Sequence, residues 1–248
     1  MSRFLRLPVE ASRHAADVDR LIVNVHWLIA VLAVGFGMFF LYCLVRFSRR
    51  LNPRARRGGV PAGIAWILIV AIAAVELFEL FFSAIPIWAA RVSNIPAPEQ
   101  STLVRVVAQQ FAWNVHYPGA DGKFGRSDPT LIAPDNPLGL DRSDPAGKDD
   151  VTTINELYFP VGKPVLVQLT SMDVVHSFSL PQMRVKQDAI PGMMIPVWFV
   201  PTEVTPADER WEINCSQLCG MAHYRMRGFY RSVTAAEFAA FLRRDQAR

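Results

Sequence analysis

Hydrophobic and polar positions divide this chain into two regions. Residues 21–45 contain no charged side chain, and residues 63–90 form a second apolar run whose only charges are Glu76 and Glu79. A helix needs about 20 mostly apolar residues to cross the hydrocarbon core of a bilayer. The pattern therefore predicts transmembrane helices over residues 21–47 and 63–90, preceded by a tail over residues 1–20.

Two alternatives to membrane spans exist for these runs. Either run can be a buried core helix, although soluble helices seldom continue so long without a charge. The first run can also be a cleaved signal peptide, but it is long for that role and Glu10, Asp17 and Asp19 precede it. Both alternatives are therefore disfavoured.

Short strands replace the long runs in residues 91–248. Segments rich in valine, isoleucine and aromatic residues lie between proline, glycine or polar clusters, namely 103–109, 164–170, 195–200 and 211–215. This pattern predicts a small antiparallel β-sandwich or barrel. Residues 118–150 are rich in proline, glycine and aspartate and are expected to form an irregular insertion. Thr234 followed by Glu237 predicts a capping box that opens a short C-terminal helix.

Charge predicts which side of the membrane each region occupies. The net charge is +4, and the loop over residues 48–62 is rich in arginine without any acidic residue. Arginine-rich loops stay on the cytoplasmic side, so the tail and residues 91–248 are expected outside. The acidic excess within residues 121–156 either attracts a basic protein or serves solubility. The positive residues at the end of the first run and in this loop are Arg46, Arg49, Arg50, Arg54, Arg56 and Arg57.

Soft metal donors are concentrated near the C-terminus. Cys215, Cys219, His223 and Met226 lie in one short stretch, and His176 lies upstream at the edge of another predicted strand. Sulfur together with imidazole favours copper over hard cations. A mononuclear blue copper site leaves one cysteine unused, and a Cys₂His₂ zinc site leaves Met226 unused. Two coppers bridged by both thiolates use every donor; a disulfide is the remaining alternative.

These motifs resemble a known family. Cys-Ser-x-x-Cys-Gly-x-x-His-x-x-Met over residues 215–226, Asp-Val-x-His-Ser-Phe over 173–178 and the stretch 186–192 resemble subunit II of cytochrome c oxidases. The resemblance spans nearly the whole chain. It implies a two-helix transmembrane hairpin followed by an all-β cupredoxin-like sandwich, with the short C-terminal helix at the end.

The resemblance also implies a dinuclear copper centre of the CuA type. In that centre Cys215 and Cys219 bridge the two coppers. One copper also takes His176 and, as a weak ligand, Met226. The other takes His223 and the backbone carbonyl of Gln217.

Two positions depart from the usual family pattern. Gln217 stands where the family commonly has a glutamate whose side chain reaches a magnesium ion, and a neutral amide weakens that role. Asp173 is a further candidate for the magnesium neighbourhood, or else a hydrogen-bonding residue of a turn. Phe111 occupies the place of the family's electron-entry tryptophan, with Trp113 two residues later. Both are expected either to line the entry or to belong to the core.

The function implied by the resemblance is electron entry into a respiratory oxidase. The copper pair would take electrons from cytochrome c or an equivalent carrier and pass them to haem in subunit I. Oxygen is reduced to water there, coupled to proton translocation. Without a Cys-x-x-Cys-His motif, no covalently attached haem is expected in this chain. Expected partners are subunit I, other oxidase subunits and a cytochrome or cytochrome-containing donor complex, at the inner membrane with the copper domain outside.

Other functions remain open from the sequence alone. A quinol oxidase subunit keeps the fold without copper, and the complete donor set argues against it. A membrane-anchored copper chaperone of the thioredoxin type also uses Cys-x-x-x-Cys, but it has no use for Met226. A nitric or nitrous oxide reductase component would use the same copper pair. Glu76 and Glu79 are expected to face the partner subunit, as proton-handling groups or as structural hydrogen bonders.

Overall fold

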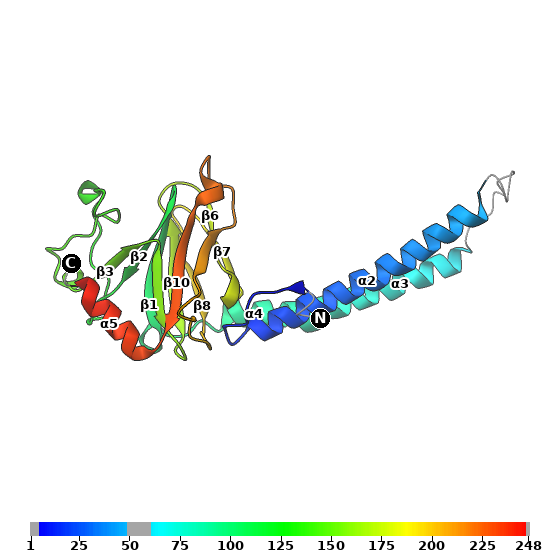
Figure 1. Cartoon of the computed structure of the whole chain (residues 1–248), viewed down its shortest axis with the longest axis horizontal. Coiled ribbons are helices and arrows are strands. Elements are labelled where there is room, and N and C mark those ends of the chain that lie inside the picture. Colours follow the sequence, from blue (N-terminus) through cyan, green and yellow to red (C-terminus); the bar gives the residue numbers. More distant parts are fainter. Residues whose placement is uncertain (1–4, 49–60, 247–248) are drawn as a thin grey trace. The chain divides into compact units, whose positions relative to one another are not determined.

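The computed structural model describes residues 5–48 and 61–246 (Figure 1). The chain forms two compact units. One contains the two apolar helical segments, and the other combines Pro8–Ala16 with Asn94–Arg248. Most of the arginine-rich loop lies outside the described residues, including Arg49, Arg50, Arg54, Arg56 and Arg57.

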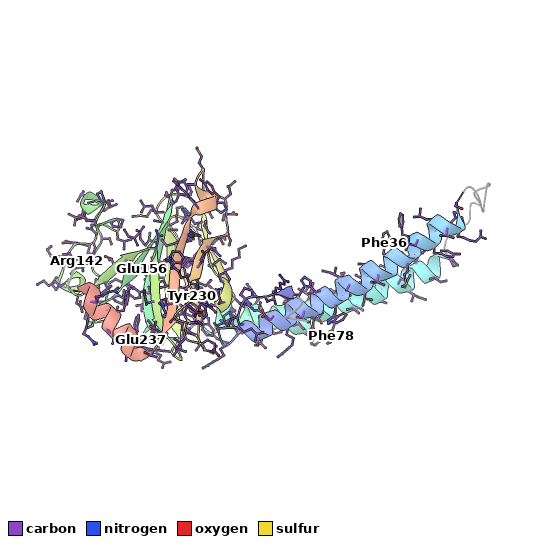
Figure 2. All side chains as sticks on the ribbon, in the orientation of Figure 1. Phe36, Phe78, Arg142, Glu156, Tyr230 and Glu237 are labelled. Carbon is purple, nitrogen blue, oxygen red and sulfur yellow. The ribbon has the colours of Figure 1, made fainter. Side chains whose placement is uncertain are left out.

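The helical unit consists of α2 (Ala15–Arg46) and a second helical segment made of α3 (Ala62–Glu79), a π-helical turn (Leu80–Ala84) and α4 (Ile85–Ser93). Ala15–Arg46 and Gly63–Ser93 are each long and apolar enough to cross a membrane. Large apolar side chains such as Phe36 and Phe78 are exposed (Figure 2), as expected for surfaces that meet lipid or another membrane subunit.

Both helical segments extend beyond the apolar runs that predict them. The α2 helix begins at Ala15, and its first turns carry Asp17 and Arg20, which lie 3.6 Å apart at the polar end. The second segment continues to Ser93 through the π-helical turn. That turn ends two residues before Pro86, whose missing N–H and bulky ring disturb a regular helical hydrogen-bond ladder.

The other unit is a sandwich of two five-stranded sheets. The first sheet has the order β3-β2-β1-β5-β8 and the second has the order β4-β10-β9-β6-β7. The strands of the first sheet are β1 (Thr102–Gln109), β2 (Ala112–Tyr117), β3 (Val151–Ile154), β5 (Val165–Ser171) and β8 (Ile195–Phe199). Those of the second are β4 (Glu156–Pro160), β6 (His176–Leu180), β7 (Val185–Ala189), β9 (Trp211–Cys215) and β10 (Arg227–Val233).

The sheets are mixed rather than purely antiparallel, which corrects the expectation from sequence. Strand β1 pairs in parallel with β5, and β4 pairs in parallel with β10, while the other pairs are antiparallel. Parallel neighbours require a long crossover connection, and both pairs are indeed formed by strands distant in the chain. Strand patterns alone do not indicate which distant strands will pair.

Large side chains from both sheets fill the space between them. Trp113, Phe159, Phe178, Phe199 and Tyr230 are wholly buried, and Figure 2 labels Tyr230 among the strands. Several of these rings meet edge to face, including Trp113 with Phe178 at a centroid distance of 5.5 Å. This aromatic core supports the strand ends from which the metal donors project.

The N-terminal segment Pro8–Ala16 is part of the β unit. Ala11 donates its N–H to the carbonyl of Gln182 at 3.0 Å and accepts from Thr202 at 2.9 Å. Arg13 donates its N–H to Val200 at 2.9 Å. The tail predicted over residues 1–20 is therefore divided between a segment bound to the sandwich and the first turns of α2.

The insertion over residues 118–150 is irregular, and a buried carboxylate anchors it. The structure places in it two short 3₁₀ turns, Pro129–Leu131 and Pro145–Gly147. Asp150 Oδ2 lies 2.6 Å from His116 Nε2 of β2, and the same carboxylate accepts the N–H groups of Gly119 and Gly125 at 3.1 and 2.8 Å. The insertion is thus held against the outer face of the first sheet.

The C-terminal helix α5 (Ala235–Gln246) begins with the predicted capping box. Glu237 donates its N–H to Thr234 Oγ1 at 3.3 Å, and Thr234 donates its N–H to Glu237 Oε2 at 2.9 Å. Phe241 of this helix stacks on Tyr158 of β4 at a centroid distance of 4.3 Å. The reciprocal cap is confirmed, and it fixes where the helix starts.

Candidate metal centre

Two neighbouring strands of the second sheet bring the predicted donors together. His176 opens β6 and Cys215 closes β9, and the two strands pair with Phe178 opposite Cys215. The remaining donors, Cys219, His223 and Met226, lie in the connection from β9 to β10. Because the strands run antiparallel, the start of one and the end of the other meet at the same end of the sandwich, near the short orange turn of Figure 1.

The two cysteine sulfurs form the middle of the cluster. Cys215 Sγ lies 3.7 Å from Cys219 Sγ. His176 Nδ1 lies 3.9 Å from Cys215 Sγ, and His223 Nδ1 lies 3.6 Å from Cys219 Sγ. The donor atoms of His176, Cys215 and Cys219 all lie within 4.8 Å of one another. Each sulfur thus has an imidazole nitrogen beside it.

The weaker donors fall into two groups around these sulfurs. Met226 is buried, and its Sδ lies 3.2 Å from His176 Nδ1 and 3.6 Å from Cys219 Sγ. The backbone oxygen of Gln217 lies 3.2 Å from Cys215 Sγ. Soft sulfur and imidazole donors at these separations fit copper, with Met226 on the His176 side.

The sequence matches the family model described as "Cytochrome C oxidase subunit II, periplasmic domain" over residues 103–233, which is more than half of the chain. The chain belongs to the cytochrome c oxidase subunit II family. The "Alternative cytochrome c oxidase subunit 2" of Bradyrhizobium diazoefficiens is 33% identical over 230 residues, covering 92% of this chain and 80% of the relative.

Further relatives carry the same family name. The "Cytochrome c oxidase subunit 2" of Cereibacter sphaeroides is 30% identical over 254 residues, covering 91% of this chain and 76% of that one. Among solved structures, the periplasmic domain of subunit II of cytochrome oxidase of Bradyrhizobium japonicum is 28% identical, with a TM-score of 0.43. It covers 62% of this chain and 97% of that structure.

Membership in the subunit II family gives the chain its general context. The chain is a membrane protein with a periplasmic-type β domain, and its family forms part of the haem–copper oxidase, an oxidoreductase complex that also contains subunit I. The family implies copper of the CuA type, and the side chains present here fit it by donor chemistry. The thioredoxin-type copper chaperone is thereby set aside, because that class has a different fold.

The two cysteines of this site, Cys215 and Cys219, differ in acidity. Burial opposes ionisation of Cys215, but hydrogen bonds from the His176 ring and from the backbone at Ser177 and Gln217 outweigh it and lower the pKa of Cys215 to about 6. Burial, together with the adjacent Cys215, raises the pKa of Cys219 to about 12. The first thiolate therefore forms readily, whereas the second forms when a metal displaces its proton.

Asp173 orients the His176 ring. Its Oδ1 lies 2.9 Å from His176 Nε2, so His176 directs Nδ1 toward the sulfurs. A carboxylate on the outer nitrogen of a ligand histidine fixes the ring orientation and tautomer. Asp173 also accepts the N–H groups of Val174 and Gln110, both at 2.7 Å. A magnesium ion near Asp173 and Gln217 would have to share a carboxylate whose two oxygens already accept hydrogen bonds.

Phe111 and Trp113 occupy different environments. Trp113 lies on β2 and is wholly buried, with its ring 6.2 Å from the His176 ring in an edge-on arrangement. Phe111 lies in the turn before β2 and is half-buried. A Cβ added at Gly220 would lie 3.3 Å from Phe111 Cε1, so the ring covers that glycine of the metal loop. Residues i and i+2 share a face only within a strand, and Phe111 precedes the first residue of β2. Strand alternation therefore gives no reason for Phe111 and Trp113 to share a face.

Sequence reasoning missed Gln110 and the partner of His116. Gln110 donates its side-chain N–H to the carbonyl of Cys219 at 2.7 Å. A glutamine in a turn has no characteristic motif, although its place directly before Phe111 is a weak signal. His116 meets Asp150, which lies 34 residues later in the chain. Local spacing offers no way to identify that pair.

Proposed function

We propose that this chain is the electron-entry subunit of a cytochrome c oxidase. A dinuclear copper centre takes electrons from cytochrome c or an equivalent carrier and passes them to haem in subunit I. Oxygen is reduced to water in that subunit, coupled to proton translocation. The family supports the general role, and the arrangement of donors in this chain supports the specific one.

The observation that carries the proposal is the central pair of sulfurs. Cys215 Sγ and Cys219 Sγ are 3.7 Å apart, with His176 beside one and His223 beside the other. This near-symmetric set suits two metals that share both thiolates, and a blue copper site would leave one cysteine unused. When bound, the copper pair supplies a one-electron redox site, and the surrounding protein holds its ligands in one geometry.

The two aromatic residues have separate roles in this proposal. Phe111 is the entry residue, because it is half-buried at the surface turn and its ring lies against Gly220 of the metal loop. Trp113 supports the site from inside, since its ring packs edge-on to His176 and no part of it reaches solvent. An incoming electron therefore meets Phe111 before it reaches the copper ligands.

Topology supports a location in the inner membrane with the copper domain outside. The arginines between the two spans favour a cytoplasmic loop. The segment Pro8–Ala16 is hydrogen-bonded to the β domain, so the chain before the first span lies on the same side as the domain after the second. Two spans joined by a cytoplasmic loop require this common side.

Polar residues within the spans mark the proposed face for subunit I. Asn24 of α2 donates its side-chain N–H to Glu79 Oε1 of α3 at 3.4 Å. Among the described residues, Glu79 Oε2 is buried without a hydrogen-bond partner. An intramembrane carboxylate is costly unless it meets protein or water. We therefore assign Glu79 the role of a structural hydrogen bonder between the two helices, and we place the exposed Glu76, one turn earlier, toward the partner subunit.

The test uses the assembled oxidase with the full-length chain. We expect two coppers in this subunit and a mixed-valence electron paramagnetic resonance signal shared over both. Cys215→Ser and Cys219→Ser should each abolish that signal, because each removes a bridging ligand. Cys43→Ser in α2 is the matched control and should leave the signal unchanged. One copper per subunit with a blue-copper spectrum, or zinc in place of copper, would refute the proposal.

A further inference from the structure

We infer that Gln110 and Asp173 are positioning residues that fasten the β1–β2 turn, and with it Phe111, to the copper centre at two separate ligands. The inference rests on the proposed electron-entry function. It adds that the entry residue and the metal ligands are held as one unit by two side chains that bind no metal.

The first attachment runs through the Asp173 carboxylate. Its Oδ1 accepts the N–H of His176 Nε2 at 2.9 Å, and its Oδ2 accepts the backbone N–H of Gln110 at 2.7 Å. One carboxylate thus joins a copper histidine to the residue directly before Phe111. Hydrogen bonds to a charged acceptor are about twice as strong as neutral ones, so this link resists displacement of the turn.

The second attachment runs through the Gln110 side chain. Its Nε2 donates to the backbone carbonyl of Cys219 at 2.7 Å. Cys219 is one of the two sulfur donors at the middle of the cluster. Gln110 is therefore held at two points. Its backbone N–H binds Asp173, which also binds His176, and its side chain binds the carbonyl of Cys219 in the metal loop.

Gly220 shows how closely the turn lies against the metal loop. A Cβ at Gly220 would lie 2.7 Å from Gln110 Nε2 and 3.3 Å from the Phe111 ring, and its φ is +127°. The backbone conformation therefore favours glycine at this position, and a Cβ would also displace the end of the Gln110 side chain. The Phe111 ring thus lies against the metal loop directly beside the Gln110 hydrogen bond to that loop.

The two attachments close a ring of contacts through the metal site. His176 Nδ1 lies 3.2 Å from Met226 Sδ, which lies 3.6 Å from Cys219 Sγ. The carbonyl of Cys219 accepts from the Gln110 side chain, and the Gln110 backbone N–H binds Asp173. Asp173 in turn binds His176, which completes the ring. In such a closed network, each contact restricts the others. Electron tunnelling falls steeply with distance, so a fixed separation between Phe111 and Cys219 sets the rate of electron entry.

Asp173 has a second conceivable role as a surface charge that attracts a basic donor. Its side chain is 29% exposed, and both of its oxygens accept hydrogen bonds from within the domain. A residue that only attracts a donor acts at long range and weakens as salt screens it. A positioning residue acts after the donor has bound, at any ionic strength. The two roles are thus separable by experiment.

The main test measures the rate at which reduced cytochrome c, at saturating concentration, reduces the copper centre of the assembled oxidase by stopped flow. Gln110→Ala and Gln110→Glu should each slow this step about tenfold, a typical effect of removing an outer-shell partner. The glutamate keeps the volume but replaces the N–H donor by an oxygen that faces the Cys219 carbonyl. Gln109→Ala is the matched control, because that side chain instead accepts from Asn114 at 2.9 Å.

Both Gln110 variants should retain two coppers and the mixed-valence signal, which separates slow entry from a damaged metal site. Rates equal to those of the wild type and of Gln109→Ala would overturn the inference for Gln110. Asp173→Asn should slow the same step at both low and high salt, and it should shift the reduction potential of the copper pair. An effect seen only at low salt would overturn the inference for Asp173. Absence of a mixed-valence centre from the wild type would instead refute the proposed function.

Discussion

Two histidine–carboxylate pairs belong to different sheets of the sandwich, one with its histidine on β2 and the other with its histidine on β6, and they serve different ends. His176 lies 2.9 Å from Asp173, and His116 lies 2.6 Å from Asp150. Both imidazoles are buried. The His176 ring turns its other nitrogen toward the sulfurs of the metal site. The His116 ring instead packs edge-on against Phe124 of the insertion at 4.8 Å.

The difference lies in what else each carboxylate and ring contact. Asp150 accepts hydrogen bonds from the backbone N–H groups of Gly119 and Gly125, so the His116–Asp150 pair fastens a long irregular segment to the sheet. Asp173 accepts the N–H of Gln110, so its pair connects the proposed ligand His176 to the β1–β2 turn. The same two residue types thus anchor the insertion in one place and, in the proposed function, support a metal ligand in the other.

The largest effect should come from removing His176, the proposed copper ligand. His176→Ala takes away one metal donor and the partner of Asp173, and we expect copper affinity to fall by more than about 100-fold, since even outer-shell changes commonly cost 10–100-fold. Copper analysis and electron paramagnetic resonance of the assembled oxidase measure this loss. His116→Ala is the comparison variant and should keep both coppers. Loss of copper from both variants would contradict the claim that only the His176–Asp173 pair supports the metal site.

Removing the anchoring histidine should lower stability instead. His116→Ala leaves the buried Asp150 carboxylate without its side-chain partner, and we expect the free energy of unfolding to fall by about 3 kcal/mol. Denaturant unfolding of the purified subunit measures the change, with susceptibility of residues 118–150 to proteolysis as a local readout. An unfolding midpoint that does not move would show that the insertion is held by other contacts.

Acid should release the insertion only at low pH. Burial opposes ionisation of Asp150, but hydrogen bonds from His116, Gly125 and Gly119 outweigh it and hold its pKa below the usual 3.8. A depressed pKa stabilises the fold above 3.8, and this contribution is lost as the pH falls through the lower folded-state value. The protection factors for hydrogen exchange at Gly119 and Gly125, which compare each amide with its intrinsic rate at the same pH, should therefore stay high at pH 5 and fall below about pH 3.8. Release at pH 5 to 6 would contradict this assignment.

Local patterns predicted much of this molecule. The charge-free run over residues 21–45 predicted the first helix because a membrane span depends on composition along a single segment. Thr234 and Glu237 predicted the helix start because the two residues cap each other within one turn. The spacing from Cys215 to Met226 predicted most of the donor set because the loop itself brings those residues together.

Other features needed distant parts of the chain to meet. The parallel pairing of β1 with β5 depends on a crossover that no strand pattern specifies. The Asp150 anchor joins residues 34 apart, and the Gln110 contact with Cys219 joins residues 109 apart. Sequence also treated Phe111 and Trp113 as equivalent, whereas Phe111 lies half-buried in the turn before β2 and Trp113 is wholly buried on the strand.

The sequence by itself determined the membrane segments, the β-rich domain and the chemistry of the metal donors, because hydrophobicity and donor type belong to single residues and short segments. The tertiary structure decided that Asp173 binds the His176 ring, that His116 meets Asp150 of the insertion and that Gln110 holds the β1–β2 turn against the metal loop. These contacts join residues that lie far apart in the chain, such as Gln110 with Cys219 and His116 with Asp150. Such residues come close together only when the chain has folded into the sandwich.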